Sequence, residues 1–423
     1  MITDDNIHDL VKRYENQSII QKYGRIKNWN VSRVTDMSYL FYNMEHFNED
    51  ISNWDVSNVT NMCAMFINAN SFNQPLDMWD VSNVTDMSSM FEDANSFNQS
   101  LNVWDVSSVT DMSRMFENAH SFNQPLDKWD VSNVTDMSSM FENATYFNQT
   151  LNNWNVSNLT NMAFMFQNAT SFDQPLNKWD VSNVTDMKFM FCYATSFNQP
   201  LNNWDVSNVT DMAFMFENAT SFNQPLNKWD VSNVTDMAFM FCYATSFNQP
   251  LNNWNVSNVT NMSSMFKNAT SFNQPLNKWN VSNVTNMSSM FEGNTLMTDE
   301  RKPSAENYKK YINNVLPMIY TAKEGVFTIG KTKLPTVVSK LIYEHGVDSE
   351  KAKELAEHDE RIGNTINEIQ YKRMKKEIAA MQQEDKNIKS TSKGSNRSKG
   401  SNGNKGGSKR RIKKYSRRSK KKY

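Results

Sequence analysis

Side chains that commonly perform catalysis or bind metals are few in this sequence and widely spaced. The 423 residues include only five histidines and three cysteines. The histidines are His8, His46, His120, His345 and His358. Three cysteines cannot form a disulfide framework, which is typical of a protein from a reducing compartment. The sequence therefore gives little material for a His-based metal site or a nucleophilic triad, and we expect no cofactor and no enzymatic activity.

Charged side chains are divided unevenly along the chain. The formal net charge is −1, but residues 386–423 hold 16 Lys/Arg and no Asp/Glu. The preceding 385 residues hold 28 Lys/Arg against 45 Asp/Glu, a net charge of −17. The chain is therefore an acidic body with a basic tail.

The apolar residues exclude several classes of protein. No stretch of 18 apolar residues exists, so we expect no transmembrane helix. The start of the chain lacks the basic and apolar regions of a secretory signal. We therefore expect an intracellular protein, cytoplasmic or nuclear, with a surface location as the alternative.

The tryptophans reveal a repeat. All eleven are spaced 25 residues apart, from Trp29 to Trp279. Counting each Trp as position zero, Val recurs at +2, Met at +8, Phe at +12 and +18, and Leu or Ile at +22. An unbroken period of this length predicts a solenoid in which each 25-residue coil contacts its neighbours.

The pattern within one coil predicts both a strand and a helix. Trp and Val alternate with polar residues at positions 0 to +3, which is typical of a strand with one buried face. Positions +8, +11, +12 and +15 have the spacing of one face of a short helix, with the Thr at +6 as its N-cap. We therefore expect an α/β, leucine-rich-repeat-like solenoid of eleven strand–helix coils, with the Asn at +4 and +19 forming stacked amide ladders.

The solenoid divides the chain into four parts. Residues 1–23 are expected to form an N-terminal capping helix, with Ile7, Leu10, Val11 and Tyr14 on its apolar side. The solenoid follows over residues 24–297. Residues 298–385 have a helical composition, and residues 386–423 the Gly/Ser/Lys-rich composition of a disordered basic tail.

The repeat resembles that of a known family. Its consensus begins Trp-Asp-Val-Ser-Asn-Val-Thr-Asp-Met-Ser-Ser-Met-Phe-Glu-Asn, as residues 129–143 show. It is similar to the repeat of the BspA-like leucine-rich-repeat surface proteins, also known from mycoplasma proteins of unknown function. The resemblance covers about residues 24–292. It implies a leucine-rich-repeat-like fold, a role in binding or adhesion, and no catalytic residues.

The expected sheet face is a polar lattice. It would carry an acid at +1 in seven coils and a lysine at −1 in four. These residues are Asp55, Asp80, Asp105, Asp130, Asp180, Asp205, Asp230, Lys128, Lys178, Lys228 and Lys278. Such a lattice could bind a repetitive ligand such as a glycan by avidity. It could also be a solvated face, which is the interpretation that we favour.

The expected outer helix face has a more specific feature. Position +10 should point to solvent, yet four consecutive coils place Phe there, with two tyrosines at the outward position +14. These residues are Phe164, Phe189, Phe214, Phe239, Tyr193 and Tyr243. They would form a contiguous apolar patch, which predicts a docking surface for the C-terminal segment or for another protein. The alternative is duplication of a neutral residue, because residues 179–228 and 229–278 are near-copies.

The basic tail predicts contact with polyanions. Its cations are concentrated at the end of the chain, as Lys409, Arg410, Arg411, Lys413, Lys414, Arg417, Arg418, Lys420, Lys421 and Lys422. Such a run binds nucleic acid or other polyanions without sequence specificity. It could equally be a nuclear localisation signal, neutralise the acidic solenoid, or increase solubility.

Taken together, these features predict a non-enzymatic protein-interaction scaffold with a repetitive binding surface and a polyanion-binding tail. The partner protein is not identified by the sequence. The alternative function is that of an adhesin or glycan-binding surface protein.

Overall fold

The computed structural model describes residues 1–303, 328–329 and 332–333. The chain divides into two units, Met1–Lys323 and Glu324–Tyr423. In the second unit, β1 (Thr328–Ile329) pairs antiparallel with β2 (Thr332–Lys333), where the sequence analysis expected no strand. The helices expected within residues 304–385 and the tail at 386–423 lie outside the described residues, and residues 298–303 form turns.

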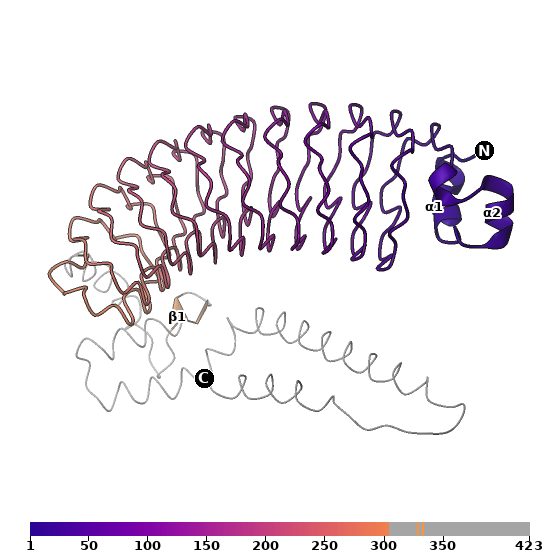
Figure 1. The fold of residues 1–423 in the computed structure, drawn as a ribbon. Helices are drawn as coiled ribbons and strands as arrows, with labels where there is room; N and C mark the ends of the chain where they lie inside the picture. The colour runs from indigo at the N-terminus through magenta and orange to yellow at the C-terminus, as the bar shows by residue number, and fades with distance from the viewer. Residues whose placement is uncertain (304–327, 330–331, 334–423) are drawn as a thin grey trace, which may run out of the picture. The chain divides into compact units, whose positions relative to one another are not determined.

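The first unit is a solenoid of eleven stacked coils that follow a curved axis (Figure 1). Every tryptophan is buried, with at most 3% of its surface exposed. From Trp54 onward, each indole N–H group donates to the carbonyl group 28 residues earlier in the chain, as Trp204 does to Leu176 at 3.0 Å. The expected repeat and its buried aromatic ladder are therefore confirmed.

The coils lack the expected strand. Positions 0 to +5 instead form two turns, in which the N–H of Trp204 donates to Leu201 and that of Val209 donates to Val206. The polar residue at +1 accepts a hydrogen bond from the Ser at +3, which closes a further turn, as Asp205 and Ser207 show. One residue per coil, at +7, makes an isolated parallel bridge to the next coil. The alternating hydrophobicity at 0 to +5 thus belongs to turns, because the backbone N–H groups of Trp204 and Val209 donate within their own segment and not to a neighbouring coil.

The coils also lack the expected helix. Between +8 and +15 the chain makes consecutive turns of the i to i+3 type, such as that from Met212 to Met215. The N–H groups at +8, +10, +12 and +14 donate to carbonyl groups of the next coil, so they are not available for helical bonds. The backbone is left-handed at +10 and +14, with φ near +60° in every coil. Repeated turns place the same residues inward as a helix would, which explains why the periodicity was misleading.

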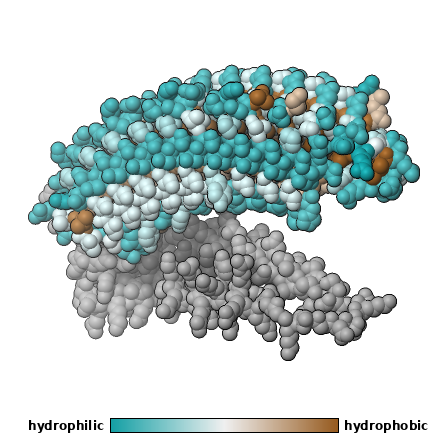
Figure 2. All heavy atoms as spheres, in the orientation of Figure 1, coloured by the Kyte–Doolittle hydropathy of each residue, from teal (hydrophilic) through white to brown (hydrophobic). Residues whose placement is uncertain are grey.

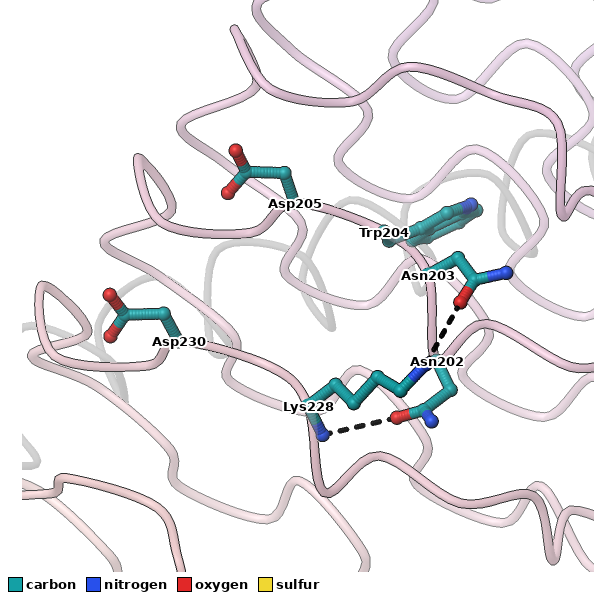
Figure 3. Close-up of a pocket in the computed structure, with 6 residues that line it drawn as sticks. All are labelled: Asn202, Asn203, Trp204, Asp205, Lys228 and Asp230. Carbon is teal, nitrogen blue, oxygen red and sulfur yellow. Dashed lines mark hydrogen bonds between the residues drawn. The ribbon is translucent and has the colours of Figure 1, made fainter.

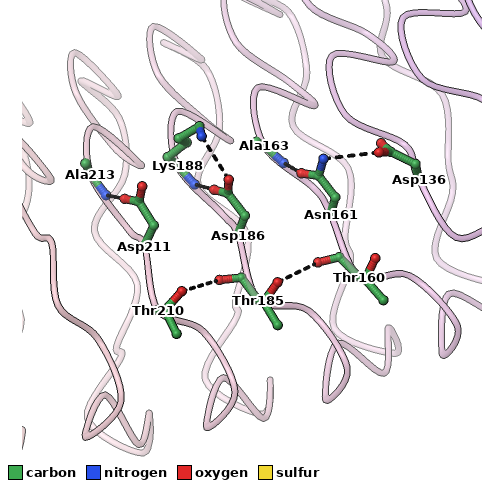
Figure 4. A network of polar contacts seen from close by, with 10 residues as sticks. All are labelled: Asp136, Thr160, Asn161, Ala163, Thr185, Asp186, Lys188, Thr210, Asp211 and Ala213. Carbon is green, nitrogen blue, oxygen red and sulfur yellow. Dashed lines mark hydrogen bonds and ion pairs between the residues drawn. The ribbon is translucent and has the colours of Figure 1, made fainter.

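Polar ladders complete the links between coils. The side-chain amide of Asn208 donates to Ser182 of the preceding coil at 2.7 Å, and the backbone N–H of Asn223 donates to the side chain of Asn198 at 2.9 Å. The corresponding residues of other coils repeat these bonds, which confirms the expected Asn ladders. The threonines at +6 form another ladder rather than helix caps (Figure 4).

The N-terminal end is capped by two helices rather than one. They are α1 (Asp4–Val11) and α2 (Gln17–Tyr23), and the short η1 (Ile26–Asn28) follows. The carboxylate of Asp4 accepts hydrogen bonds from Thr35 and Asp36, and His8 Nε2 donates to the Ser38 carbonyl group at 2.8 Å. Helix α1 thereby supplies the first coil with the hydrogen-bond partners that later coils receive from the coil before them.

The C-terminal end of the solenoid is closed by the chain that follows the last coil. Asn294 is buried, donates to the carbonyl group of Phe272 and accepts from the N–H groups of Leu296 and Met297. The Arg301 side chain donates to Asn273 at 2.7 Å. The residues that depart from the repeat, such as Asn294, thus form the hydrogen bonds that close the last coil.

Candidate functional site

The four phenylalanines at position +10 form one continuous stack on the surface of the solenoid. Their ring centroids are 4.7 Å apart between Phe164 and Phe189, 4.3 Å between Phe189 and Phe214, and 4.6 Å between Phe214 and Phe239. Adjacent rings are within 9° of parallel, and all four side chains are partly exposed. We call these four residues the surface Phe ladder. The sequence predicted their grouping, although on a helix that does not form.

The backbone explains why the ladder faces outward. Each of the four residues has a left-handed conformation, with φ between 58° and 63°. Each also donates its N–H to the carbonyl group of the residue at +9 in the next coil, as Phe214 does to Ala238 at 2.8 Å. A left-handed conformation costs about 1–2 kcal/mol for a residue other than glycine and is unusual for a bulky one. The coil therefore imposes this conformation at +10 whatever side chain is present, since tyrosine, alanine, arginine or serine occupies it in the other coils.

The two tyrosines of the expected patch occupy the second left-handed position, +14. Tyr193 is 43% exposed and Tyr243 is 41% exposed. They lie two coils apart and donate their N–H groups to Glu217 and Lys267 of the next coils. Both are therefore held by the backbone with their side chains directed away from the core.

A column of Asp and Asn at position +7 was missed as a surface feature by the sequence analysis. Each residue caps a turn by accepting the N–H of the residue at +9, as Asp211 does from Ala213 at 2.9 Å (Figure 4). In the coils that contribute to the surface Phe ladder, the aspartates of this column are Asp186, Asp211 and Asp236, which we call the Asp column, and the fourth member is Asn161. Burial raises the pKa of Asp211, and repulsion from its two neighbours raises it further. The signal in the sequence was the invariable Asp or Asn at +7.

One lysine connects the Asp column to the surface Phe ladder. Lys188 Nζ is 2.9 Å from the Asp186 carboxylate and 5.9 Å from the centroid of the Phe164 ring. The pKa of Lys188 is raised, chiefly by its hydrogen bond to Asp186. An ammonium group can therefore contact a carboxylate and a phenyl ring on this surface at the same time.

Position +13 carries a column of half-buried acids and thiols. Burial raises the pKa of Glu117 to about 7, with repulsion from Glu142 and Glu92 adding to the effect. Burial also raises the pKa of Cys192, whose thiol donates to Glu217 at 3.5 Å, and that of Cys242, to about 12. These cysteines are free, as their separation of two coils predicts, and a protonated thiol is a poor nucleophile.

The polar lattice exists, but on turns rather than on a sheet. The seven aspartates at +1 and the four lysines at −1 are exposed. Hydrogen bonds from the Ser at +3 lower the pKa of Asp55, Asp105 and Asp205. The aspartates are thus engaged in closing their own turns.

A shallow depression lies within this lattice (Figure 3). Its volume is about 310 Å³, and it is lined by Asn202, Asn203, Trp204, Asp205, Lys228 and Asp230. Lys228 reaches back to the preceding coil, where its Nζ is 3.5 Å from the Asn203 side chain. The depression is open and polar, and Figure 2 shows that the visible face of the solenoid is mostly hydrophilic.

The described residues contain no candidate metal site and no membrane-spanning helix. Among them, no group of three His, Cys, Asp or Glu could hold a metal ion. No helix in the same part of the chain is long and apolar enough to cross a membrane. The ten cations of the basic tail lie outside the described residues.

A comparison with known families identifies the family to which the solenoid belongs. Three overlapping segments, residues 8–129, 110–223 and 194–304, match a family described as "Mycoplasma protein of unknown function, DUF285". The match extends over residues 8–304, so the chain belongs to this family of repeat proteins. A search of curated proteins found no match.

Proposed function

We propose that this protein is a non-enzymatic interaction scaffold that binds a partner protein through the surface Phe ladder. The observation that supports this most directly is the stack of four partly exposed rings on consecutive coils. A contiguous apolar patch of this kind on a hydrophilic surface is typical of a binding site. The rings also occupy a strained backbone conformation that serine or alanine occupies in five other coils, so folding alone does not require them.

The basic tail supplies the second part of the proposed function. Its 16 Lys/Arg without any acid would bind nucleic acid or another polyanion by releasing counterions. The scaffold would then connect a protein partner to a polyanion.

The test of the scaffold function removes the ladder and retains the coils. Phe164→Ser, Phe189→Ser, Phe214→Ser and Phe239→Ser are combined in the full chain, because serine is the natural residue at +10 in Ser89 and Ser139. Partners are captured from cells, crosslinked and quantified for the wild type and the variant. We expect specific partners to be lost from the variant. Equal capture by both proteins would contradict the proposal.

A control variant leaves the ladder intact. It replaces Asp80, Asp105, Asp180 and Asp205 by Asn, which occupies the same +1 position naturally in Asn155 and Asn255. Capture should be unchanged, because the turn at +1 forms with either residue. For the tail, deletion of residues 386–423 should abolish retention on a polyanion column.

The alternative function is that of an adhesin or glycan-binding surface protein, as the more specific resemblance to BspA-like repeats would imply. The open polar depression at Asn203 and Lys228 favours it, because amide, carboxylate and ammonium groups can all bind sugar hydroxyl groups. Equivalent side chains recur every two coils, which would give avidity for a repetitive glycan. The test is a variant of the depression itself, Asn203→Ala combined with Lys228→Ala: it should lose binding on a glycan array, whereas the ladder variant should retain it.

A further inference from the structure

The surface Phe ladder lies on the inner side of the curved solenoid. Ring centroids of adjacent coils are 4.3–4.7 Å apart in this ladder, but 6.4 Å apart among Trp154, Trp179 and Trp204 of the same coils. The coils are therefore closest together at +10 and spread apart at the tryptophans, in agreement with the curved axis in Figure 1. A concave surface of this kind favours a narrow partner that lies along it over a broad, flat one.

The backbone beside the ladder is closed to the addition of a strand. In the four ladder coils, the N–H groups at +8, +10, +12 and +14 already donate to the next coil, as Met212, Phe214 and Phe216 do at 2.8–3.1 Å. A ligand therefore finds no free backbone donor among these groups, so it cannot pair with them as an extra strand. It must be held by side chains, and its own backbone must need no regular partner.

The spacing of the rings distinguishes among the regular conformations that such a ligand can adopt. Two successive steps, of 4.7 and 4.3 Å, carry a ligand about 9 Å along the ladder. One turn of a polyproline II helix has three residues and rises about 9.3 Å. An α-helix repeats about every 5.4 Å, and alternate residues of a strand about every 6.6 Å, so neither stays in step with the rings. A polyproline II ligand can therefore place an equivalent residue at every second ring.

The two tyrosines at +14 follow the same period of two coils. Burial and the nearby Glu217 raise the pKa of Tyr193, so its hydroxyl group remains a hydrogen-bond donor at neutral pH. Tyr243 repeats this exposed hydroxyl group two coils later. The carbonyl groups of a polyproline II helix have no internal partner and can accept such bonds. The edges of the stacked rings carry partial positive charge, which also suits these carbonyl groups.

Acidic side chains flank the ladder. Positions +7, +9 and +13 of the four ladder coils contain four carboxyl groups, those of the Asp column and Glu217, and one ammonium group, that of Lys188. Lys188 pairs with Asp186 at 2.9 Å and also acts on Asp211, so it offsets part of this negative charge. A ligand that carries lysine or arginine beside its apolar residues therefore complements this surface better than an acidic one.

We propose that the surface Phe ladder is the docking surface for a basic, proline-rich segment of a partner protein in the polyproline II conformation. Apolar residues of the segment would contact every second ring, and its carbonyl groups would accept hydrogen bonds from Tyr193 and Tyr243. Its lysines or arginines would face the Asp column. Such segments dock on aromatic-lined surfaces because their conformation is preformed and little entropy is lost. The inference rests on the proposed function, since it names the class of partner for the same ladder.

The first test measures direct binding of defined peptides to the full chain. The probes are fluorescein-labelled peptides of three Pro-Pro-Leu units with Arg-Arg at the N-terminus, at the C-terminus or at both ends. Each has a control in which glycine replaces proline, which retains the charge and the leucines. By fluorescence anisotropy, at least one proline peptide should bind about tenfold more tightly than its control, because the glycine chain must be ordered on binding. No binding, or equal binding of every matched pair, would overturn the proposal.

A matched pair of variants tests the period of two coils. Phe189→Ser/Phe239→Ser retains Phe164 and Phe214, which are two coils apart. Phe189→Ser/Phe214→Ser also removes two rings, but it retains Phe164 and Phe239, which are three coils apart. The first variant should bind the proline peptide about threefold more tightly than the second, the equivalent of one aromatic contact. Equal affinities or the reverse order would contradict polyproline II docking, and circular dichroism verifies that both variants remain folded.

Asp186→Asn combined with Asp236→Asn tests the flanking charge. Asparagine occupies +7 naturally at Asn161, where it caps the same turn by accepting the N–H of Ala163 at 3.0 Å. The variant should weaken the binding of the arginine-containing peptides and reduce the dependence of that binding on salt. Binding of the proline peptide without arginine should be unchanged. An equal effect on both kinds of peptide would contradict recognition of the ligand's cations by the Asp column.

Two combined outcomes separate this inference from the proposed function. If no peptide binds while the serine variant of the ladder still loses its captured partners, the class of partner is wrong and the scaffold function remains. If the proline peptides bind at the ladder but capture from cells does not depend on it, the class of ligand is supported and the scaffold function fails.

Discussion

The solenoid contains two kinds of phenylalanine ladder, one buried and one on the surface, built on neighbouring positions of the same coils. In the buried ladder, each ring at +12 stacks on the ring at +18 of its own coil, at 4.1 Å between Phe191 and Phe197. It also stacks on its equivalents in adjacent coils, at 5.6 Å between Phe191 and Phe216. In the surface ladder, rings stack only on their equivalents in adjacent coils, at 4.3–4.7 Å between centroids.

This difference indicates which of the two ladders stabilises the fold. A buried ring belongs to a network extending across and along the coils, so its removal leaves a cavity that several neighbours border. A surface ring belongs to a single row, and its position is occupied by serine or alanine in five other coils. The buried ladder is thus expected to determine stability, and the surface ladder to determine binding.

The largest expected effect is a difference in stability between a variant of the buried ladder and a variant of the surface ladder. Phe191→Ala should destabilise the solenoid by about 3–5 kcal/mol, because it empties a fully buried site. Phe189→Ser should cost no more than about 1.5 kcal/mol, since lost stacking is partly offset by release of a strained bulky residue. Urea unfolding of both variants measures the difference. Equal losses of stability would remove the distinction between the ladders.

A substitution in the tryptophan ladder should reduce stability through the loss of an indole hydrogen bond. Trp204→Phe retains a buried ring but leaves the Leu176 carbonyl group without the indole donor at 3.0 Å. We expect a loss of about 2–3 kcal/mol in the free energy of unfolding, smaller than that of Phe191→Ala. The same urea titration measures it, and a neutral result would show that packing alone defines this ladder.

The column at +13 contains partly buried acids, which should make stability depend on pH. Because burial raises the pKa of Glu117 from 4.5 to about 7, the folded chain holds more protons than the unfolded chain between these values. Stability contributed by this group is therefore complete below pH 4.5 and is lost as the pH rises to about 7.

Glu117→Gln removes this dependence. Relative to wild type, the variant should gain on the order of 1 kcal/mol between pH 5 and pH 8, after allowance for solvent screening. Glutamine is tolerated at this position, as Gln167 shows. Unfolding midpoints of the two proteins at both pH values test the prediction. A constant difference between them would show that Glu117 titrates normally.

The smallest effect concerns the backbone of the surface column. Ser89 has φ of 56°, a conformation that glycine adopts without steric cost. Ser89→Gly should stabilise the solenoid by about 0.5 kcal/mol, because relief of strain exceeds the entropy that glycine loses. Phe189→Gly gains the same relief but loses two ring contacts, so it should not stabilise. Thermal midpoints compare the two, and equal stabilisation would show that surface stacking contributes nothing.

The sequence identified the ladders correctly but not the secondary structure that holds them. Spacing alone placed Trp204, Met212 and Phe216 in the core, and these residues are buried. The same spacing predicted a strand and a helix that do not form, because consecutive turns direct the same side chains inward. The Asp column was overlooked because its role in capping turns depends on that backbone.

The sequence by itself determined the repeat, the buried residues, the grouping of the four surface phenylalanines and the separation of charge between body and tail. These follow from composition and period, since identical coils must stack identical side chains. Only the tertiary structure decided the path of the backbone within a coil. Its N–H groups bond to the next coil rather than to the next turn of a helix, and that choice depends on a neighbour 25 residues away. The same long-range stacking brought Lys188, Asp186 and Phe164 together and thereby defined a site for a cation.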